Sequence, residues 1–341
     1  MDVSLIQNKK IFVGLFVLVF SIFSNRVVAQ EPTPQPAELP INEIPCEKSM
    51  AEAYFSPDGN SLIGQAKTMG ENANHEAIID LDGKNFRFLN QKGADACSHF
   101  FPNGKKVIWT STKDHLDLPA GDWSNPEDYP KGAELYVSDL YGQNPVRLTN
   151  NELYEAEVSV SPDGKWILFT REIDGQLDLW RMKPDGSQQV QITKTLDLQE
   201  GGSFYMPDSK TIVYRAWKKE DEKNERGLPM TLFLIDHDGN NNRPLTFDEG
   251  TNWAPYPHPD GHHVVFVKIL PPHNFDIFLM NLDTKEQKQL TFNSSFDGFP
   301  SISPDGKKMV FSSTRCNPPN TPREKKKMCL YWMDISSLLK L

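Results

Sequence analysis

The chain has 341 residues with 36 basic and 46 acidic side chains, so its formal net charge is −10. Without the charged residues of the first 29 positions the counts are 33 and 45, which gives −12; the residues removed are Asp2, Lys9, Lys10 and Arg26. An acidic chain without a basic stripe is a poor partner for nucleic acid or anionic lipid, and we predict neither as a ligand.

The first 29 residues have the pattern of a secretory signal peptide. Lys9 and Lys10 precede the apolar run 11–23, and Val27-Val28-Ala29 offers small residues for cleavage. The run has 13 residues, fewer than the ~20 that a membrane-spanning helix needs. We therefore predict a signal peptide at 1–29, a proline-rich linker at 30–37, no membrane span, and a mature protein that is periplasmic or secreted.

One turn phrase recurs six times, most clearly as Ser161-Pro162-Asp163-Gly164. Proline presets φ at the first central turn position, aspartate bonds back to the turn, and glycine accepts a positive φ. Residues 165–169 have a bias toward β-branched and aromatic side chains, as in a mostly buried strand. The six prolines of the phrase are Pro57, Pro102, Pro162, Pro207, Pro259 and Pro304. Successive prolines are separated by 45 to 60 residues, and six copies at such a spacing indicate a repeat protein.

The repeats have a second half that predicts two more strands; it ends in Leu-Thr at 148–149, 245–246 and 290–291, in Ile192-Thr193, and in the weaker copy Leu89-Asn90. In the second repeat, residues 134–139 form the expected third strand and Leu148-Thr149 the fourth. Pro145 and Pro244 fall in last strands, where proline is tolerated only at a sheet edge. Four antiparallel strands with the fourth at an edge make a propeller blade. The prediction is an all-β, six-bladed β-propeller of four-stranded antiparallel blades over residues 38–341.

The S-P-D-G-K phrase with its L-T ending resembles the PD-type, WD-repeat-like repeats of the TolB family of propellers. The resemblance covers roughly residues 38–341 and implies a six-bladed propeller that is exported to the periplasm. TolB proteins also carry an α/β domain before the propeller. We expect no room for such a domain before residue 38, and this departure from the TolB pattern puts a TolB-like role in the Tol–Pal system in doubt.

The ring needs a strand from the N-terminus to close it. The last third strand is expected at 330–334, and the chain stops at Leu341, too soon for a fourth strand. Ile44 precedes Pro57 by 13 residues, as Leu89 precedes Pro102. We therefore predict that 38–44 supplies the outer strand of blade six.

The first strand of each blade begins seven residues before the turn proline, on the face that also carries the long insertions. Residues at this position are expected to rim the central channel; they are Met50, Asp95, Glu155, Glu200, Asn252 and Asp297. The insertions on the same face are 113–131, 218–229, 271–274 and 315–328.

Two interpretations of these acids stay open. Asp95, Glu155, Glu200 and Asp297 would form a calcium site if they converge, with Asn252 as a neutral oxygen ligand. Alternatively, each acid caps backbone N–H groups or pairs with a cation at the end of a second strand. The candidate cations are Arg171, Arg215, Lys268 and Arg315.

The preferred function is a non-enzymatic, monomeric binding scaffold for a protein, peptide or glycan on the insertion-bearing face. The residues expected to contact the ligand are the channel-mouth positions Asp95, Glu155, Glu200, Asn252 and Asp297, together with Arg171, His115, Trp123 and His273.

The alternative function is a metal-assisted lyase or hydrolase centred on the channel. His75, His115 and His273 would approximate the histidine metal site of propeller lyases that act on polyuronates. Glu155 and Glu157 could also act as an acid and a base. The sequence has no G-x-S-x-G phrase, which argues against a serine nucleophile.

Four cysteines in an exported chain predict disulfides. Cys316 ends the second strand of blade six and Cys329 opens the third, so the two lie at the mouth of one hairpin within bridging range. Cys46 and Cys97 are the remaining pair.

Overall fold

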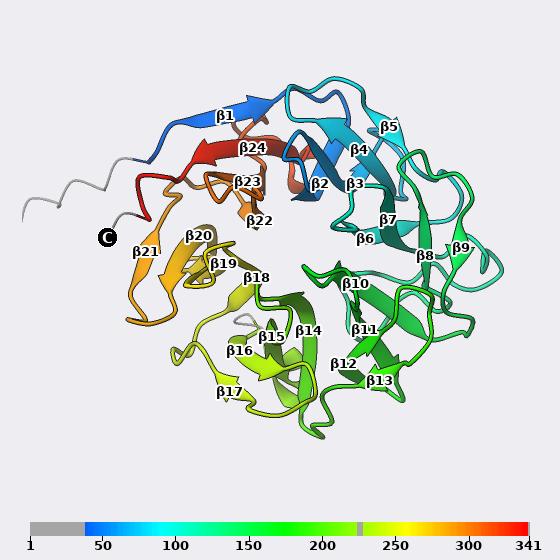
Figure 1. The fold of residues 1–341 in the computed structure, drawn as a ribbon. Coiled ribbons are helices and arrows are strands. Elements are labelled where there is room, and N and C mark those ends of the chain that lie inside the picture. Colours follow the sequence, from blue (N-terminus) through cyan, green and yellow to red (C-terminus); the bar gives the residue numbers. More distant parts are fainter. Residues whose placement is uncertain (1–37, 224–227, 340–341) are drawn as a thin grey trace, which may run out of the picture. The chain divides into compact units, whose positions relative to one another are not determined.

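Six four-stranded antiparallel sheets surround a central channel in the computed structural model, which describes residues 38–223 and 228–339 (Figure 1). Each sheet is one blade, with its first strand at the channel and its fourth at the outer edge. The predicted all-β six-bladed propeller is confirmed. The predicted signal peptide (1–29) and linker (30–37) lie outside the described residues.

The blades follow one another along the chain. Blade one contains β2 (Ser49–Phe55), β3 (Ser61–Lys67), β4 (His75–Asp80) and β5 (Arg87–Phe88). Blade two contains β6 (Asp95–Phe100), β7 (Lys106–Ser111), β8 (Glu134–Asp139) and β9 (Val146–Arg147). Blade three contains β10 (Tyr154–Val160), β11 (Ile167–Ile173), β12 (Gln176–Met182) and β13 (Val190–Gln191). Blade four contains β14 (Leu198–Tyr205), β15 (Thr211–Lys218), β16 (Thr231–Asp236) and β17 (Arg243–Pro244). Blade five contains β18 (Asn252–Pro257), β19 (His263–Leu270), β20 (Asn274–Asn281) and β21 (Gln287–Gln289). Blade six contains β22 (Asp297–Ile302), β23 (Lys308–Ser313), β24 (Cys329–Asp334) and, as its outer strand, β1 (Ile41–Ile44).

Two short 3₁₀-helices, η1 (Lys219–Lys223) and η2 (Arg323–Lys325), lie in the insertions of blades four and six. Among the residues that the structure describes, no helix is long and apolar enough to cross a membrane.

The S-P-D-G phrase forms the turn between the first and second strands of its blade. In blade three, Ser161 Oγ donates to Asp163 Oδ1 at 2.7 Å, and the same carboxylate accepts the backbone N–H of Lys165 at 3.1 Å. Gly164 has φ +69°. In every blade the side-chain oxygen of the third residue of the phrase accepts the backbone N–H two residues later, and we call the face that carries these turns the turn face.

The Leu-Thr ending ties the fourth strand to the third. Thr149 Oγ1 accepts the backbone N–H of Leu135 at 3.0 Å, across the hairpin between β8 and β9. Equivalent bonds of 2.9–3.0 Å recur in blades three, four and five through Thr193, Thr246 and Thr291. These threonines satisfy a backbone donor that the two- or three-residue outer strands leave unpaired.

The ring closes as the sequence predicts. β1 pairs antiparallel with β24, in a register that runs from Ile41 opposite Met333 to Ile44 opposite Leu330 (Figure 1). Ile44 is fully buried, and Glu38 just before the strand forms an ion pair with Arg315 at 3.3 Å. N-terminal residues thus cover the strand edge that β24 would otherwise expose.

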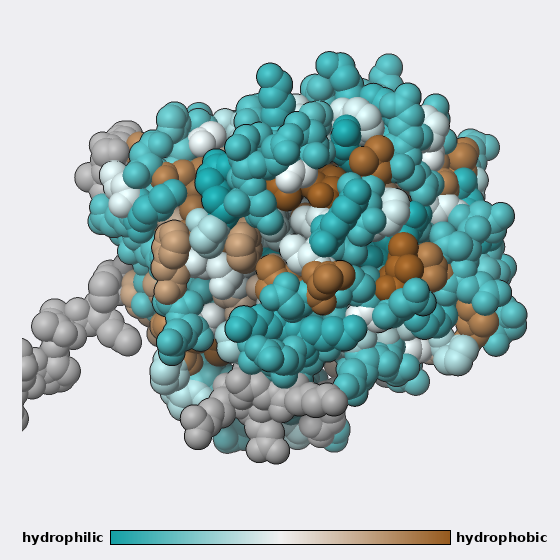
Figure 2. All heavy atoms as spheres, turned by 90° about the horizontal axis from the view of Figure 1, so that it is seen from below, coloured by the Kyte–Doolittle hydropathy of each residue, from teal (hydrophilic) through white to brown (hydrophobic). Residues whose placement is uncertain are grey.

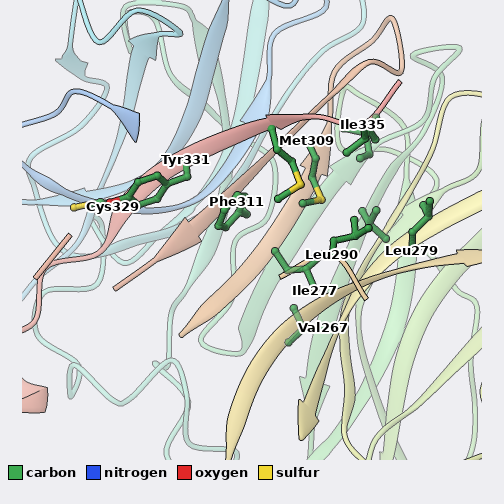
Figure 3. Close-up of a cluster of buried hydrophobic side chains, with 12 residues drawn as sticks. Val267, Ile277, Leu279, Leu290, Met309, Phe311, Cys329, Tyr331 and Ile335 are labelled. Carbon is green, nitrogen blue, oxygen red and sulfur yellow. The ribbon is translucent and has the colours of Figure 1, made fainter. Parts of the chain in front are cut away.

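Apolar side chains fill the spaces between blades. Figure 3 shows the cluster between blades five and six, where Val267 and Ile277 face Met309 and Phe311 across the gap. The side of the ring that Figure 2 shows is mainly hydrophilic, with scattered apolar side chains. The structure therefore has a succession of inter-blade cores, as expected when each blade buries its faces against its neighbours.

The structure confirms one predicted disulfide and corrects the other. Cys316 and Cys329 are bonded and close the insertion between β23 and β24. Cys46 and Cys97 are free thiols. Cys46 packs beside the apolar cluster of blade one, whereas Cys97 faces the central channel from β6, so the strand geometry does not bring the two together. Burial raises the pKa of both thiols, which keeps them protonated.

Candidate functional site

Every innermost strand contains a β-bulge at the same place. In blade three, the pairing of β10 with β11 shifts register between Ala156 and Ser159. The bulge residues have φ between +48° and +58°; they are Glu52, Cys97, Glu157, Gly202, Ala254 and Phe299. Five of the six are not glycine, although a positive φ is unfavourable for residues with a side chain. All six line one cavity in the middle of the ring.

This central cavity has a volume of about 350 Å³. Aromatic side chains from several elements form its walls; they are Trp123, Tyr129, Tyr154, Trp217, Trp253 and Phe299. Trp123 and Tyr129 come from the 113–131 insertion, and Tyr129 stacks on Tyr154 with ring centroids 4.2 Å apart. Leu228 and Met230 reach the cavity from the insertion of blade four. The cavity therefore opens toward the face that carries the insertions, which we call the insertion face.

An ion pair lies in the cavity wall between blades three and four. Glu157 Oε1 accepts from Arg215 Nη2 at 2.5 Å, and its Oε2 accepts from Thr170 Oγ1 and the backbone N–H of Gly202, both at 2.8 Å. Burial alone would raise the pKa of Glu157, but the Arg215 charge and these hydrogen bonds outweigh it and hold the pKa below its usual range. Glu157 is therefore an ionised carboxylate with its acceptor sites largely filled.

Glu52 is the second carboxylate of the cavity, and its partners are neutral. Tyr54 donates its O–H to Oε1 at 3.2 Å, and Gln65 Nε2 donates to Oε2 at 2.5 Å. None of the ion pairs among the described residues includes Glu52. Burial, followed by the negative charge of Glu157, raises the pKa of Glu52 to about 7. The charge of this site therefore changes near neutral pH.

Four rings close the channel beneath the cavity. Tyr54, His99, Phe204 and Tyr256, each two residues after a bulge, pack together with centroid distances of 4.9–6.3 Å. Burial lowers the pKa of His99 to about 4, so the ring is neutral. On the other side of these rings is an apolar cavity of about 300 Å³, lined by the six turn prolines.

The blades without an aromatic ring at this level carry serine. Ser159 Oγ donates to the carbonyl oxygen of Ser203 at 2.8 Å, and Ser301 Oγ donates to that of Ala53 at 2.7 Å. Each serine thus bonds to the next blade and leaves space for the four rings.

The five polar channel-mouth residues are not in the cavity wall. Asp95, Glu155, Glu200, Asn252 and Asp297 are all fully buried at the beginning of their strands, each in its own blade. Glu155 accepts from Arg171 Nε at 2.5 Å, and Asp297 accepts from Arg315 Nη2 at 2.6 Å. Asn90 donates to Asp95, and Thr195 donates to Glu200. Of the two interpretations of these acids, the structure supports local capping and pairing.

The four predicted metal ligands do not converge. In the parts of the chain from 38–223 and 228–339, no group of three or more His, Cys, Asp or Glu side chains could hold a metal ion. Asp95, Glu155, Glu200 and Asp297 lie in four different blades, and each has a hydrogen-bond partner of its own.

The histidines of the alternative function are also apart. His75 Nδ1 lies 3.7 Å from Asp95, whereas His115 contacts Glu134 and Arg147 in blade two. His273 packs its ring against Phe275 in blade five. Of the predicted ligand contacts outside the channel-mouth set (Arg171, His115, Trp123 and His273), Trp123 is the one that lines the central cavity.

The bulge residues, which line the cavity, lie five positions before each turn proline. The residues that the sequence predicts at the channel lie seven positions before it, two positions earlier in the strand. In a regular strand, positions seven and five before the proline would share a face. The bulge between them breaks this alternation and turns the later residue into the cavity. No motif in the sequence marks Glu52 as a site residue. The sequence pointed to Glu157 only as a possible catalytic partner of Glu155, and to Arg215 only as a possible partner of a channel-mouth acid.

Comparison with known sequences gives relatives of two kinds. No known protein-family model matches the chain. The chain is 31% identical over 251 residues to the uncharacterized protein Atu1656 of Agrobacterium fabrum, which covers 72% of this chain and 77% of that protein. It is also 30% identical over 121 residues to dipeptidyl-peptidase 5 of Porphyromonas endodontalis, where the match spans 34% of this chain but only 15% of the peptidase.

Solved structures show the same fold at low sequence identity. A putative TolB from Agrobacterium tumefaciens superposes with a TM-score of 0.59 at 18% identity, over 84% of this chain and 90% of that one. TolB from Acinetobacter baumannii gives 0.55 at 17% identity, over 87% of this chain and 65% of that one. An oligogalacturonate lyase from Vibrio parahaemolyticus gives 0.55 at 12% identity, over 89% and 95%. The chain therefore belongs to the family of the Agrobacterium fabrum protein Atu1656, and its fold is the TolB-like six-bladed β-propeller.

Proposed function

We propose that this protein is an exported, non-enzymatic binding scaffold that holds a segment of a peptide or protein chain in the central cavity of the insertion face. The observation that carries the proposal is the cavity itself, because aromatic walls enclose two carboxylates and one arginine in the middle of the ring. Concave, mostly apolar sites with a few fixed polar groups are the usual form of a ligand site.

The volume of the cavity favours a partner that inserts one or two side chains over a partner that binds across an extended interface. A cavity of about 350 Å³ is at the small end of the range for ligand pockets, about 300–1,000 Å³, and suits one or two side chains or a chain end. Buried aromatic anchors dominate the energy of many protein interfaces. The insertions around the cavity would then contact the rest of the partner.

A peptide is favoured over a glycan for two reasons. The charged groups of the wall match the charges that a polypeptide carries at its ends and on its side chains. In addition, one partial relative is a dipeptidyl-peptidase by name, although the match spans only a small part of that enzyme.

Export is part of the same proposal. The pattern of residues 1–29 is that of a signal peptide, and disulfides such as Cys316–Cys329 persist in oxidising compartments. Fractionation of cells that express the full chain tests this, since export predicts a shortened protein outside the cytoplasm. A full-length protein in the cytoplasm would contradict it.

Peptide display on the immobilised mature protein tests the binding role. We expect enriched peptides that bind the wild type, and at least tenfold weaker binding to Trp123→Ala, which removes an aromatic wall from a loop. Tyr141→Ala is the matched control, because Tyr141 is 67% exposed and does not line the cavity. Peptides that bind both variants like the wild type would place the ligand elsewhere and contradict the proposal.

The lyase or hydrolase alternative is not proposed. His75, His115 and His273 lie in blades one, two and five. Glu155 and Glu157 share β10, but each is held in an ion pair, with Arg171 and Arg215 respectively. The structural likeness to oligogalacturonate lyase, at 12% identity, concerns the fold alone.

A further inference from the structure

The charges of the three ionisable side chains Glu52, Glu157 and Arg215 in the central cavity do not sum to zero when all three are ionised. Glu157 is neutralised by Arg215 at 2.5 Å and accepts two further hydrogen bonds. Glu52 has no cationic partner within 4.0 Å among the described side chains, and its two hydrogen bonds come from a phenol and an amide. An ionised carboxylate accepts about four hydrogen bonds, so about two acceptor sites of Glu52 are unused. With Glu52 ionised, the cavity carries one uncompensated negative charge.

The cavity walls suit a cation that also has an apolar part. Trp253 and Phe299 pack edge to face with ring centroids 4.6 Å apart, and Trp123 and Tyr129 line the cavity from the 113–131 insertion. The faces of such rings attract ammonium groups and cover the carbon chain that carries them. A second acceptor lies near Glu52, since Asn74 donates through Nδ2 to Gln65 Oε1 and keeps its own side-chain oxygen for another donor.

We propose that the central cavity binds a primary ammonium group of a peptide or protein chain, with Glu52 as its counter-ion and the aromatic walls as its packing surface. The proposal rests on the proposed function and names the chemical group that the cavity selects. An N-terminal ammonium and a lysine side chain share this chemistry.

An anionic ligand fits the same cavity poorly. The guanidinium of Arg215 is held by Glu157 and lies over the ring of Trp217, 5.5 Å from its centroid. A ligand carboxylate would therefore bring a third negative charge beside Glu52 and Glu157.

Binding is expected to depend on pH through Glu52. The ionisable groups around it are Tyr54 on its own strand, Glu76 on β4, Cys97 on β6, Glu157 on β10 and Arg215 on β15. Burial raises the pKa of Tyr54 and Cys97 well above their usual values, so these two groups are neutral at pH 7. Burial also raises the pKa of Glu76 well above its usual value. Glu157 and Arg215 stay a charged pair. Glu52, with a pKa of about 7, changes its charge between pH 5.5 and 8.

The test uses benzylammonium as the cationic probe and N-benzylacetamide as its neutral counterpart, with dissociation constants from ligand-observed NMR. We expect the mature protein at pH 8 to bind the cation at least tenfold more tightly than the amide. Glu52→Gln should weaken the cation at least tenfold and leave the amide unchanged. The matched control is Glu249→Gln, since Glu249 is exposed and does not line the cavity.

A second measurement needs no variant, and therefore holds if Glu52→Gln folds poorly. The affinity of the wild type for benzylammonium should rise at least tenfold from pH 5.5 to pH 8, because Glu52 must be ionised to act as the counter-ion. A flat pH profile would overturn the inference.

The outcomes also separate this inference from the proposed function. Equal affinity for the cation and the amide would overturn the ammonium preference but leave the cavity as a binding site. No binding of either probe, together with no enriched peptide, would overturn both. Two peptide amides then identify the source of the ammonium: Phe-Ala-Ala with a free N-terminus, and N-acetylated Phe-Lys-Ala. Binding of either supports the inference, and binding of neither contradicts it.

Discussion

Replacing Glu52 by glutamine should change how the stability of the propeller depends on pH. The folded protein holds the Glu52 proton with a pKa of about 7, compared with an ordinary value of 4.5. Since the folded pKa is raised, the folded state binds this proton more tightly than the unfolded chain does. The resulting stabilisation is fully present below about pH 4.5 and is lost as the pH rises through about 7.

The size of the effect follows from the same pKa values. A rise from 4.5 to about 7 corresponds to about 3 kcal/mol at most, and we expect about 2 kcal/mol because the cavity is open to solvent. Between pH 4.5 and pH 8, the wild type should therefore lose about 2 kcal/mol more unfolding free energy than Glu52→Gln. Glu200 and Asp276 have raised pKa values of about 8 and about 6, but both proteins share them.

Urea unfolding of the two proteins at pH 4.5 and pH 8 measures this difference. Glu249→Gln serves as the control and should follow the wild type. Parallel curves for the wild type and Glu52→Gln would show that Glu52 titrates normally in the folded state, and would refute the account of an uncompensated carboxylate.

Four further predictions concern the ring and its ion pairs. Deleting 38–45 should lower the melting temperature well below that of a protein trimmed only at 30–37, because β24 loses its outer partner; equal melting temperatures would contradict the closure by β1. Replacing Cys316 and Cys329 by serine should lower the free energy of unfolding by about 2–3 kcal/mol in chemical denaturation, as expected for a loop of 13 residues. A serine variant that is as stable as the wild type would count against this estimate. Arg215→Met should destabilise by about 3–5 kcal/mol because it leaves Glu157 unpaired, while Lys218→Met, from an exposed ion pair, should cost less than about 1 kcal/mol; similar costs for the two would be inconsistent with a buried pair. Adding calcium or a chelator should leave the melting temperature unchanged, because Asp95, Glu155, Glu200 and Asp297 have local partners; a rise with calcium would restore the metal site.

The sequence predicted the fold because the information is local and repeated. Each S-P-D-G turn is built from residues that bond to one another, as Ser161 and Asp163 do. Six copies of the phrase make the repeat recognisable even where a single copy would be ambiguous. Ring closure followed from counting residues at both ends. The Cys316–Cys329 bridge followed from the geometry of a single hairpin.

The site was less accessible to such reasoning because it depends on contacts between blades. Glu157 and Arg215 are 58 residues apart, and the ion pair joins two neighbouring blades. The bulge that turns Glu52 and Cys97 into the cavity is a deviation of the backbone that no sequence motif predicts. The predicted pair Cys46–Cys97 was wrong because Cys97 is a bulge residue in the cavity wall, whereas Cys46 packs beside the apolar cluster of blade one.

The proposed ligand site is the central cavity of the insertion face. The chain has seven tryptophans; Trp123, Trp217 and Trp253 line this cavity, whereas Trp109, Trp166, Trp180 and Trp332 do not. Fluorine NMR of the protein labelled with 5-fluorotryptophan, during titration with a display-selected peptide, measures all seven at once. The account predicts that the resonances of the three cavity tryptophans shift and the other four stay in place. Shifts confined to the other four would contradict it.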